Sequence, residues 1–404
     1  MLLSIFGTDS TLESQASIVS PHITREALYY RFTKTAVRFL EMCLSWVLQR
    51  QFFSKSRLLD VAQLKFCNKL FVVDSTFFSL SPKLASALPG SGGDGSTGGC
   101  KLQTILELKQ GQLHFCEITS ATTPDQSYTS HLPEFLDAGD LILFDLGYFK
   151  VQTLNEISAR GGFFLTRFLF GLNLQDASTG EPIDVLAFDS STITDREIIL
   201  ATDKSKVKYR LIAVAATASV AEQRRRRLYE DVRRRTGKTP TKKRLEFCGW
   251  SLFLTNVSPC QLAAEKVMSF YSFRWQIEIF FKVLKSLLKI TDIHTANESR
   301  LRCHILGKIL FAALIYRFYG TVNSHCWNQY QLEISLHKLT KKFIRTASLL
   351  HSKIRKSLAR AFDSLVQNCD AFLQCCIKRK QNSRKTTLHK ISQPLPAIGF
   401  LCLT

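Results

Sequence analysis

The stretch YSFRWQIEIFFKVLK, residues 271–285, determines how we interpret this chain. Five of its polar residues follow one another in steps of 3, 4, 4 and 3: Tyr271, Arg274, Glu278, Lys282 and Lys285. Such steps keep side chains on one face of an α-helix, and the large apolar residues between them supply a side that faces a core. We therefore predict one helix over residues 260–290, with a polar face that sets one carboxylate among a tyrosine and three cations.

This face suits a site that holds a metal ion beside a DNA backbone. Carboxylate oxygens bind hard divalent cations, whereas Tyr, Arg and Lys side chains bind phosphate. The alternative is a solvated helix with ordinary Glu–Lys and Glu–Arg pairs between neighbouring turns. Two further carboxylates in suitable places would favour the metal site.

Two apolar strands end in aspartate and could supply these carboxylates. Residues 69–74, KLFVVD, end at Asp74, and residues 140–145, DLILFD, end at Asp145. Taken singly, each aspartate could serve a turn at a strand end, as we expect for Asp140. Phosphodiester cleavage, however, needs two Mg²⁺ ions held by a few carboxylates on rigid elements.

The spacing of Tyr271, Arg274, Glu278 and Lys285 resembles the motif of the insertion-sequence-four group of DDE transposases. The resemblance implies an active site with three acids and two Mg²⁺ ions, for which Mn²⁺ is an expected substitute. It also implies a homodimer that joins transposon ends and target DNA, and cut-and-paste chemistry with a hairpin at the ends.

The same resemblance implies a role for each acid. Asp74 would be the first acid and bridge both metals, Asp145 the second and Glu278 the third, each binding one metal. The family more often has Arg where Leu146 stands, although this position is not a metal ligand.

Five residues are predicted to contact DNA under the resemblance. Arg274, Lys282 and Lys285 would hold phosphates beside the scissile bond, and Tyr271 would donate its hydroxyl to a phosphate oxygen. Trp250 would stack on a base flipped out of the duplex, with core packing as the alternative.

The order of predicted elements favours an α/β fold with a ribonuclease-H-like catalytic core, an inserted mainly β subdomain, and helical N- and C-terminal regions. A helical region that binds DNA ends is expected over residues 1–66, followed by the first part of the core over 67–167. A basic β-rich insertion is expected over 168–246, the second part of the core with the motif helix over 247–325, and a basic helical tail over 326–404. Relatives often carry more chain at the start, so an N-terminally shortened protein is one interpretation.

Composition points to a polyanionic partner. The 404 residues carry a net charge of +21, so phosphate contacts would dominate affinity. The twelve cysteines form no Cys-x-x-Cys pair, which favours a reducing compartment. No secretory signal is evident at the start, and the apolar run 309–316 is shorter than the roughly 20 residues of a membrane span. We expect a cytoplasmic, nucleoid-associated protein.

These observations predict the transposase of an insertion sequence, which binds terminal inverted repeats and catalyses Mg²⁺-dependent strand cleavage and strand transfer. One alternative is an inactive DNA-binding remnant of a mobile element. Another is a stand-alone ribonuclease-H-like nuclease, against which the insertion between the second and third acids argues.

Overall fold

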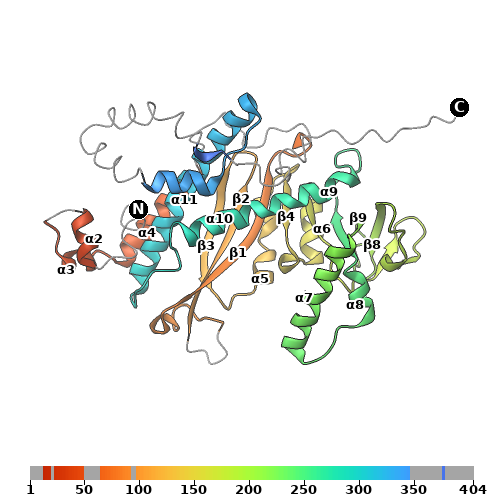
Figure 1. Ribbon diagram of the computed structural model, residues 1–404, viewed down its shortest axis with the longest axis horizontal. Helices are drawn as coiled ribbons and strands as arrows, with labels where there is room; N and C mark the ends of the chain where they lie inside the picture. The colour runs from red at the N-terminus through yellow and green to blue at the C-terminus, as the bar shows by residue number, and fades with distance from the viewer. Residues whose placement is uncertain (1–11, 20–21, 50–63, 92–96, 346–374, 378–404) are drawn as a thin grey trace. The chain divides into compact units, whose positions relative to one another are not determined.

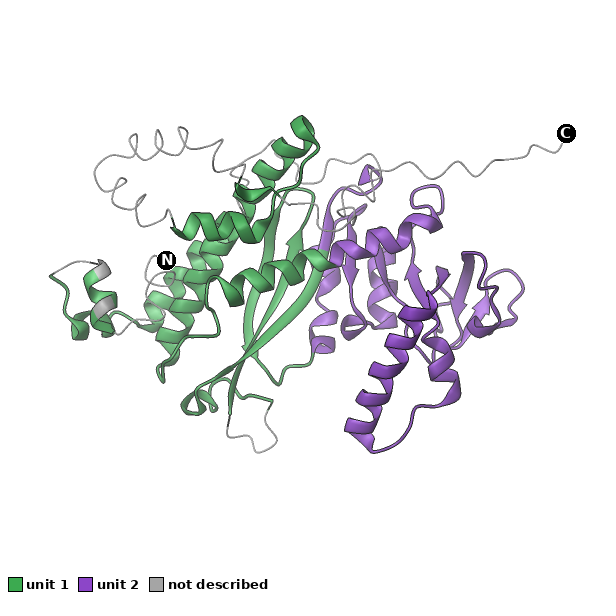
Figure 2. Cartoon of the chain, viewed as in Figure 1, with its two compact units in different colours: residues 1–60, 72–124, 275–388 green, residues 61–71, 125–274, 389–404 purple. Residues whose placement is uncertain are grey.

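The computed structural model describes residues 12–19, 22–49, 64–91, 97–345 and 375–377, and it divides the chain into two compact units (Figure 2). Unit 1 comprises residues 1–60, 72–124 and 275–388, and unit 2 comprises residues 61–71, 125–274 and 389–404. Strand β1 (Leu70–Leu80) and the stretch 271–285 each contribute residues to both units. The basic tail expected from residue 378 lies outside the described residues.

Unit 1 contains three neighbouring strands in the order β3-β2-β1 (Figure 1). Strands β2 (Gly98–Glu107) and β3 (Gln112–Ser120) form the antiparallel hairpin that the sequence predicts. The other elements of this unit are α2 (Leu12–Val19), α3 (Arg25–Tyr29), α4 (Lys34–Gln49), the short η2 (Pro82–Leu84), α10 (Trp275–Ser286), α11 (Glu298–Tyr330) and helical residues 336–345.

Helix α11 is the core helix of unit 1 and packs against α4 and β3. Its backbone comes close to the β2–β3 turn, because a Cβ at Gly320 would lie 3.0 Å from the Gln110 carbonyl oxygen. The sequence pattern predicts a helix from Arg300 to about Tyr319, whereas α11 continues to Tyr330. Its length and composition would suit a membrane span, yet 78% of its most apolar 18-residue stretch is buried inside the protein. Burial of this kind is typical of a core helix.

Unit 2 contains strands in the order β4-β5-β10-β9-β8-β6-β7. Their bounds are Leu141–Phe144 (β4), Phe163–Arg167 (β5), Leu174–Asp176 (β6), Pro182–Ile183 (β7), Thr194–Leu200 (β8), Lys208–Ala215 (β9) and Trp250–Thr255 (β10). Strands β4 and β5 are parallel and α6 (Val151–Ala159) connects them, whereas β5, β10, β9 and β8 pair antiparallel.

The remaining helices of unit 2 are α5 (Asp125–Thr129), η3 (Leu132–Phe135), η4 (Leu146–Tyr148), η5 (Val185–Ala187), α7 (Ala218–Thr236), α8 (Lys242–Phe247), α9 (Ala264–Tyr271) and η6 (Ser272–Arg274). Helix α6 ends at a glycine pair, as the sequence predicts, and Gly161 has the positive φ of +73° that favours glycine. The fold is thus mixed α/β, and the order of three strands, β4, α6 and β5 agrees with the expected ribonuclease-H-like core.

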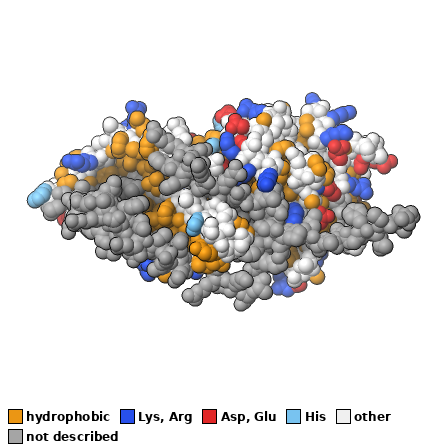
Figure 3. Space-filling model, turned by 90° about the horizontal axis from the view of Figure 1, so that it is seen from above, with side chains coloured by type: hydrophobic (Ala, Val, Ile, Leu, Met, Phe, Trp, Pro, Cys, Tyr) orange, Lys and Arg blue, Asp and Glu red, His pale blue; other side chains and the backbone are white. Residues whose placement is uncertain are grey.

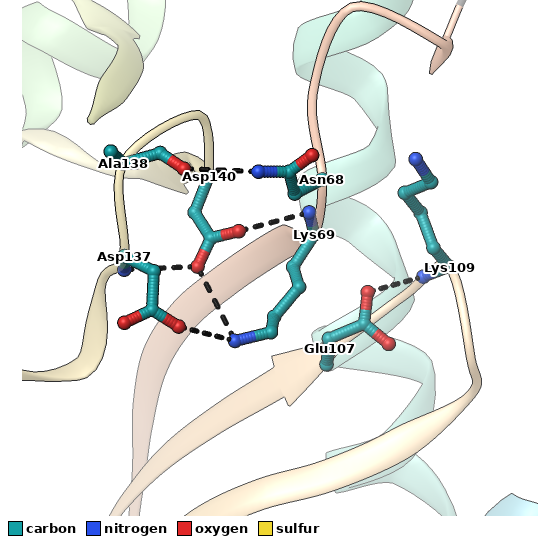
Figure 4. Close-up of polar contacts among 7 residues, drawn as sticks. All are labelled: Asn68, Lys69, Glu107, Lys109, Asp137, Ala138 and Asp140. Atoms are coloured by element: carbon teal, nitrogen blue, oxygen red, sulfur yellow. Dashed lines mark hydrogen bonds and ion pairs between the residues drawn. The ribbon is translucent and has the colours of Figure 1, made fainter. Parts of the chain in front are cut away.

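Asp140 fixes the start of β4 (Figure 4). Its fully buried carboxylate accepts hydrogen bonds from the Lys69 and Asp137 backbone N–H groups, each at 3.1 Å. The Lys69 ammonium lies 3.6 Å from the same carboxylate and 2.8 Å from that of Asp137. Asp140 therefore stabilises the turn before the strand, as expected from its position.

Several element boundaries differ from the sequence-based prediction. Strand β1, which the sequence pattern predicts to end at Asp74, continues to Leu80, so Asp74 lies within the strand. The helix predicted over 260–290 is α9, the 3-10 turn η6 and α10, so the five polar residues do not share one continuous helix. The buried rings of Phe270 in α9 and Phe273 in η6 lie edge to face, with 5.9 Å between their centroids. The apolar pattern of residues 247–255 predicts a strand, but β10 begins only at Trp250, after α8. The pattern of residues 23–53 predicts one helix, whereas the structure has two, separated at residues 30–33.

Candidate active site

Tyr271 and Asp145 come together in unit 2 although 126 positions separate them. The Tyr271 hydroxyl lies 3.4 Å from Asp145 Oδ1 and 3.3 Å from the Phe144 carbonyl oxygen. Asp145 follows the buried strand β4 and caps η4, where its Oδ1 accepts from the Leu146 N–H at 2.8 Å. The Tyr271 ring packs against Phe253 of β10, with 5.3 Å between ring centroids. The motif residue is thus held against the aspartate by packing as well as by hydrogen bonding.

The surroundings of Tyr271 keep its hydroxyl protonated. Burial, followed by the charge of Asp145, raises the pKa of Tyr271 well above its ordinary value, while Arg274 and Arg167 act in the opposite direction. Tyr271 is therefore a hydrogen-bond donor at neutral pH.

Arg167 is a charged residue near this site that the sequence analysis missed. It is exposed at the end of β5, where its backbone pairs with Phe253, the residue that contacts the Tyr271 ring. The sequence offered one signal for this residue: an arginine that ends an otherwise mostly buried strand, Phe163–Arg167. Unit 2 thus places two cations, Arg167 and Arg274, in the electrostatic surroundings of Tyr271.

Unit 1 holds the other two predicted acids on elements that touch. Lys285 of α10 donates from Nζ to the carbonyl oxygen of Phe77 on β1 at 3.0 Å, and the ammonium lies 5.9 Å from the Phe77 ring centroid. Figure 1 shows α10 lying across the strands of this unit. Asp74 is three residues from the contact along β1 and Glu278 seven residues from it along α10, each about 10 Å away at ordinary strand and helix rises.

Both Asp74 and Glu278 are partly exposed. Asp74 Oδ1 accepts a hydrogen bond from the Ser75 N–H at 2.8 Å, the same arrangement that Asp145 makes with Leu146. Glu278 stands on α10 between residues whose side chains are buried, Ile277 and Phe280. Burial also lowers the pKa of Lys285.

The donor chemistry of these acids fits a hard divalent cation. For Asp145, both hydrogen bonds go to Oδ1, and no described residue donates to Oδ2. Carboxylate oxygens held by rigid strands and helices are the ligands that Mg²⁺ takes together with water. Within the described residues no three His, Cys, Asp or Glu side chains form a metal-binding group.

Two predicted DNA contacts lie in different surroundings. Lys282 is exposed on α10. Trp250 is only 9% exposed at the start of β10, and its ring makes an edge-to-face contact with Phe188 at 6.2 Å. This burial supports core packing for Trp250, since base stacking needs an accessible ring face.

Comparison with known proteins relates the whole core to one protein class. The transposase DDE domain family matches residues 65–315, more than half of the chain. The transposase for insertion sequence element IS231C of Bacillus thuringiensis subsp. berliner is 28% identical over 383 residues, which are 83% of this chain and 79% of that protein. The transposase for IS1151 of Clostridium perfringens is also 28% identical, over 92% of this chain and 82% of its own length.

Among solved structures, the piggyBac transposase synaptic complex with hairpin DNA matches 95% of this chain and 75% of its own, with 11% identity and a TM-score of 0.45. The family match covers the strands and helices that carry Asp74, Asp145 and Glu278. The chain therefore belongs to the DDE transposase family.

Proposed function

We propose that this DDE transposase recognises the terminal inverted repeats of an insertion sequence, cuts the DNA there and transfers the freed 3′ end to target DNA. The contact between Tyr271 and Asp145 carries the proposal, because it joins the motif stretch to a strand-end acid far away in sequence. The matches to insertion-sequence transposases over most of the chain support the same activity.

In this proposal Asp74, Asp145 and Glu278 are the metal ligands. Two Mg²⁺ ions, or Mn²⁺ in their place, would activate the attacking oxygen and neutralise charge on the leaving oxygen. Asp145 presents Oδ2 while its Oδ1 is held by Leu146 and Tyr271, so the carboxylate is oriented before a ligand arrives. Such preorganisation reduces the cost of assembling the site.

The cationic residues would bind the DNA backbone near the reacting bond. Arg274 and Arg167 surround Tyr271 in unit 2, and Lys285 is held at Phe77 in unit 1. Arginine binds phosphate through two parallel hydrogen bonds, whereas lysine acts as a point charge. The proposed partner is duplex DNA, and the proposed assembly is a homodimer at the paired ends. We also propose that the reaction passes through a hairpin intermediate and that the protein acts in the cytoplasm with the nucleoid.

The test compares wild type with Glu278→Gln on duplex DNA that carries the ends of the encoding element. Wild type should cut at the ends only when Mg²⁺ or Mn²⁺ is present, and the variant should bind the ends without cutting. Glu265→Gln on α9 is the matched control, since Glu265 is exposed and near in sequence. It should cut as wild type does.

The other outcomes separate the rival functions. Binding of ends without cleavage by wild type would identify a DNA-binding remnant. Cleavage of branched or nicked DNA regardless of the end sequence would identify a stand-alone nuclease. Cutting that persists in Glu278→Gln would show that the third acid is misassigned. Sedimentation of the end-bound protein as a monomer would contradict the homodimer.

A further inference from the structure

Helices α7 and α8 with the turn between them, residues 218–247, form a basic arm that the proposed active site does not use. Of these 30 residues, eleven are Lys or Arg and four are Asp or Glu. The arm therefore holds an excess of seven positive charges, a third of the chain's net +21. Figure 2 shows the two helices extending from the strands of unit 2.

One side of α7 anchors the arm to its own unit. Ala221 is buried, and the guanidinium of Arg224 donates to the Trp250 carbonyl oxygen at 2.8 Å and to Ser251 Oγ at 3.0 Å. Arg225 donates to the Leu245 carbonyl oxygen of α8 at 3.2 Å. These two arginines are structural, and they fix the helices on which the remaining cations stand.

The other arginines of α7 are exposed and divide into two groups. Arg226 pairs with Glu222 at 2.5 Å, and Arg234 pairs with Asp231 at 2.6 Å. Arg227, Arg233 and Arg235 make no ion pair or hydrogen bond with any described residue. Arg233 and Arg235 are in the last turn, where cations stabilise the helix dipole, but Arg227 is in the middle of the helix and has no such role.

The three unpaired arginines point in different directions around the helix. At about 100° per residue they cannot all face the floor of one DNA groove. They can instead reach phosphates on both sides of a groove, and phosphate contacts carry no sequence information. On the right-hand part of the face seen in Figure 3, Lys and Arg side chains are interspersed with Asp and Glu.

We propose that the α7–α8 arm binds the phosphate backbone of duplex DNA without reading its sequence. The inference rests on the proposed function for the choice of DNA over other polyanions. It adds a second contact surface to the transposase, one suited to target DNA or to DNA flanking the ends. Guanidinium groups match phosphate geometry, and each phosphate neutralised releases counterions from the duplex.

The experiment measures the affinity of the full chain for duplexes with and without the element's ends, at several salt concentrations and without divalent metal. The variant Arg227→Gln, Arg233→Gln, Arg235→Gln should bind both duplexes about tenfold or more weakly, and its log–log salt slope should be smaller by about 2–3. Replacement of the same three residues by Lys should retain most of the slope, because lysine keeps the charge.

The matched control removes three exposed lysines outside the arm, Lys65, Lys83 and Lys204, by replacement with Gln. It should change the salt slope less than the arm variant does. All variants should unfold within a few degrees of the wild-type temperature, since none of the residues is buried and the helix-dipole contribution of Arg233 and Arg235 is small.

The proposal would be overturned by an unchanged slope in the arm variant, by an equal loss in the lysine control, or by a loss confined to end-bearing DNA. A loss of RNA or heparin binding with intact duplex binding would also overturn it. Because no cleavage is scored, failure of the arm is separable from failure of the transposase assignment. A failure of the transposase assignment would appear in the separate cleavage assay, as wild-type protein that binds duplex DNA but never cuts it.

Discussion

The hydroxyl of Tyr271 lies 3.4 Å from Oδ1 of Asp145 and 3.3 Å from the Phe144 carbonyl oxygen, so the last residue of α9 contacts the carboxylate that follows β4. The contact links the segments around residues 145 and 271, which the sequence alone relates only through a family resemblance. It also gives Tyr271 a partner within the protein, in addition to the phosphate contact first predicted for it. A hydroxyl that orients a metal ligand should affect the Mg²⁺ concentration that cleavage requires.

Tyr271→Phe removes this hydrogen bond and keeps the ring against Phe253. We expect cleavage to fall by roughly tenfold, the equivalent of one hydrogen bond, with a higher Mg²⁺ concentration needed for half-maximal rate. Tyr30→Phe is the control, because Tyr30 is 76% exposed. A Mg²⁺ titration identical to wild type would show that Tyr271 does not orient Asp145.

Arg167→Gln removes a cation from the surroundings of Tyr271. We expect weaker binding of the cleaved end and a slower strand-transfer rate, with partial recovery in Arg167→Lys, because lysine restores the charge without the bidentate geometry. Single-turnover assays would separate binding from chemistry. Arg196→Gln, on β8, is the control. Equal effects of the two substitutions would indicate a general loss of charge and would argue against a local role.

Asp140→Asn tests the turn before β4. Asparagine cannot make the two backbone hydrogen bonds, one to each oxygen, and the ion pair with Lys69 that the carboxylate makes. The free energy of unfolding should therefore fall by about 2 kcal/mol. Asp137→Asn should cost about 0.5 kcal/mol or less, because its side chain is 80% exposed. Urea unfolding of both variants measures the difference, and equal losses would contradict the assigned role of Asp140.

His304 makes stability depend on pH. Burial, then the charges of Arg300 and Lys308, lower the pKa of His304 to about 3 from the model-compound value of 6.5. Below pH 6.5 the unfolded state therefore binds a proton that the folded state does not, and stability is lost as pH falls from about 6.5 to about 3.

His304→Phe keeps a ring beside Phe32 and removes Nδ1, which has no hydrogen-bond partner among the described residues. Relative to wild type, the variant should gain about 2 kcal/mol between pH 7.5 and pH 5 in urea unfolding. His131→Asn, at an exposed histidine, is the control. Parallel pH profiles of wild type and His304→Phe would contradict the prediction.

The sequence by itself determined the class of fold and the residues worth examining. The apolar run that ends in Asp145 forms β4, and the run that ends in Asp74 forms the first part of β1, which continues to Leu80; local hydrophobic composition was enough to predict that both runs are strands. The glycines at 161–162 end α6 for a local reason too, since only the backbone of one residue must take a positive φ.

Only the tertiary structure decided how the motif stretch is divided. The buried rings of Phe270 and Phe273 pack together across the end of α9, where a 3-10 turn interrupts the helix, so Tyr271 and Arg274 precede the helix that carries Glu278 and Lys285. Helical spacing alone cannot show this, because it records periodicity and not which core each apolar side chain enters. For the same reason the contacts of Tyr271 with Asp145 and of Lys285 with Phe77 became visible only when distant segments packed together.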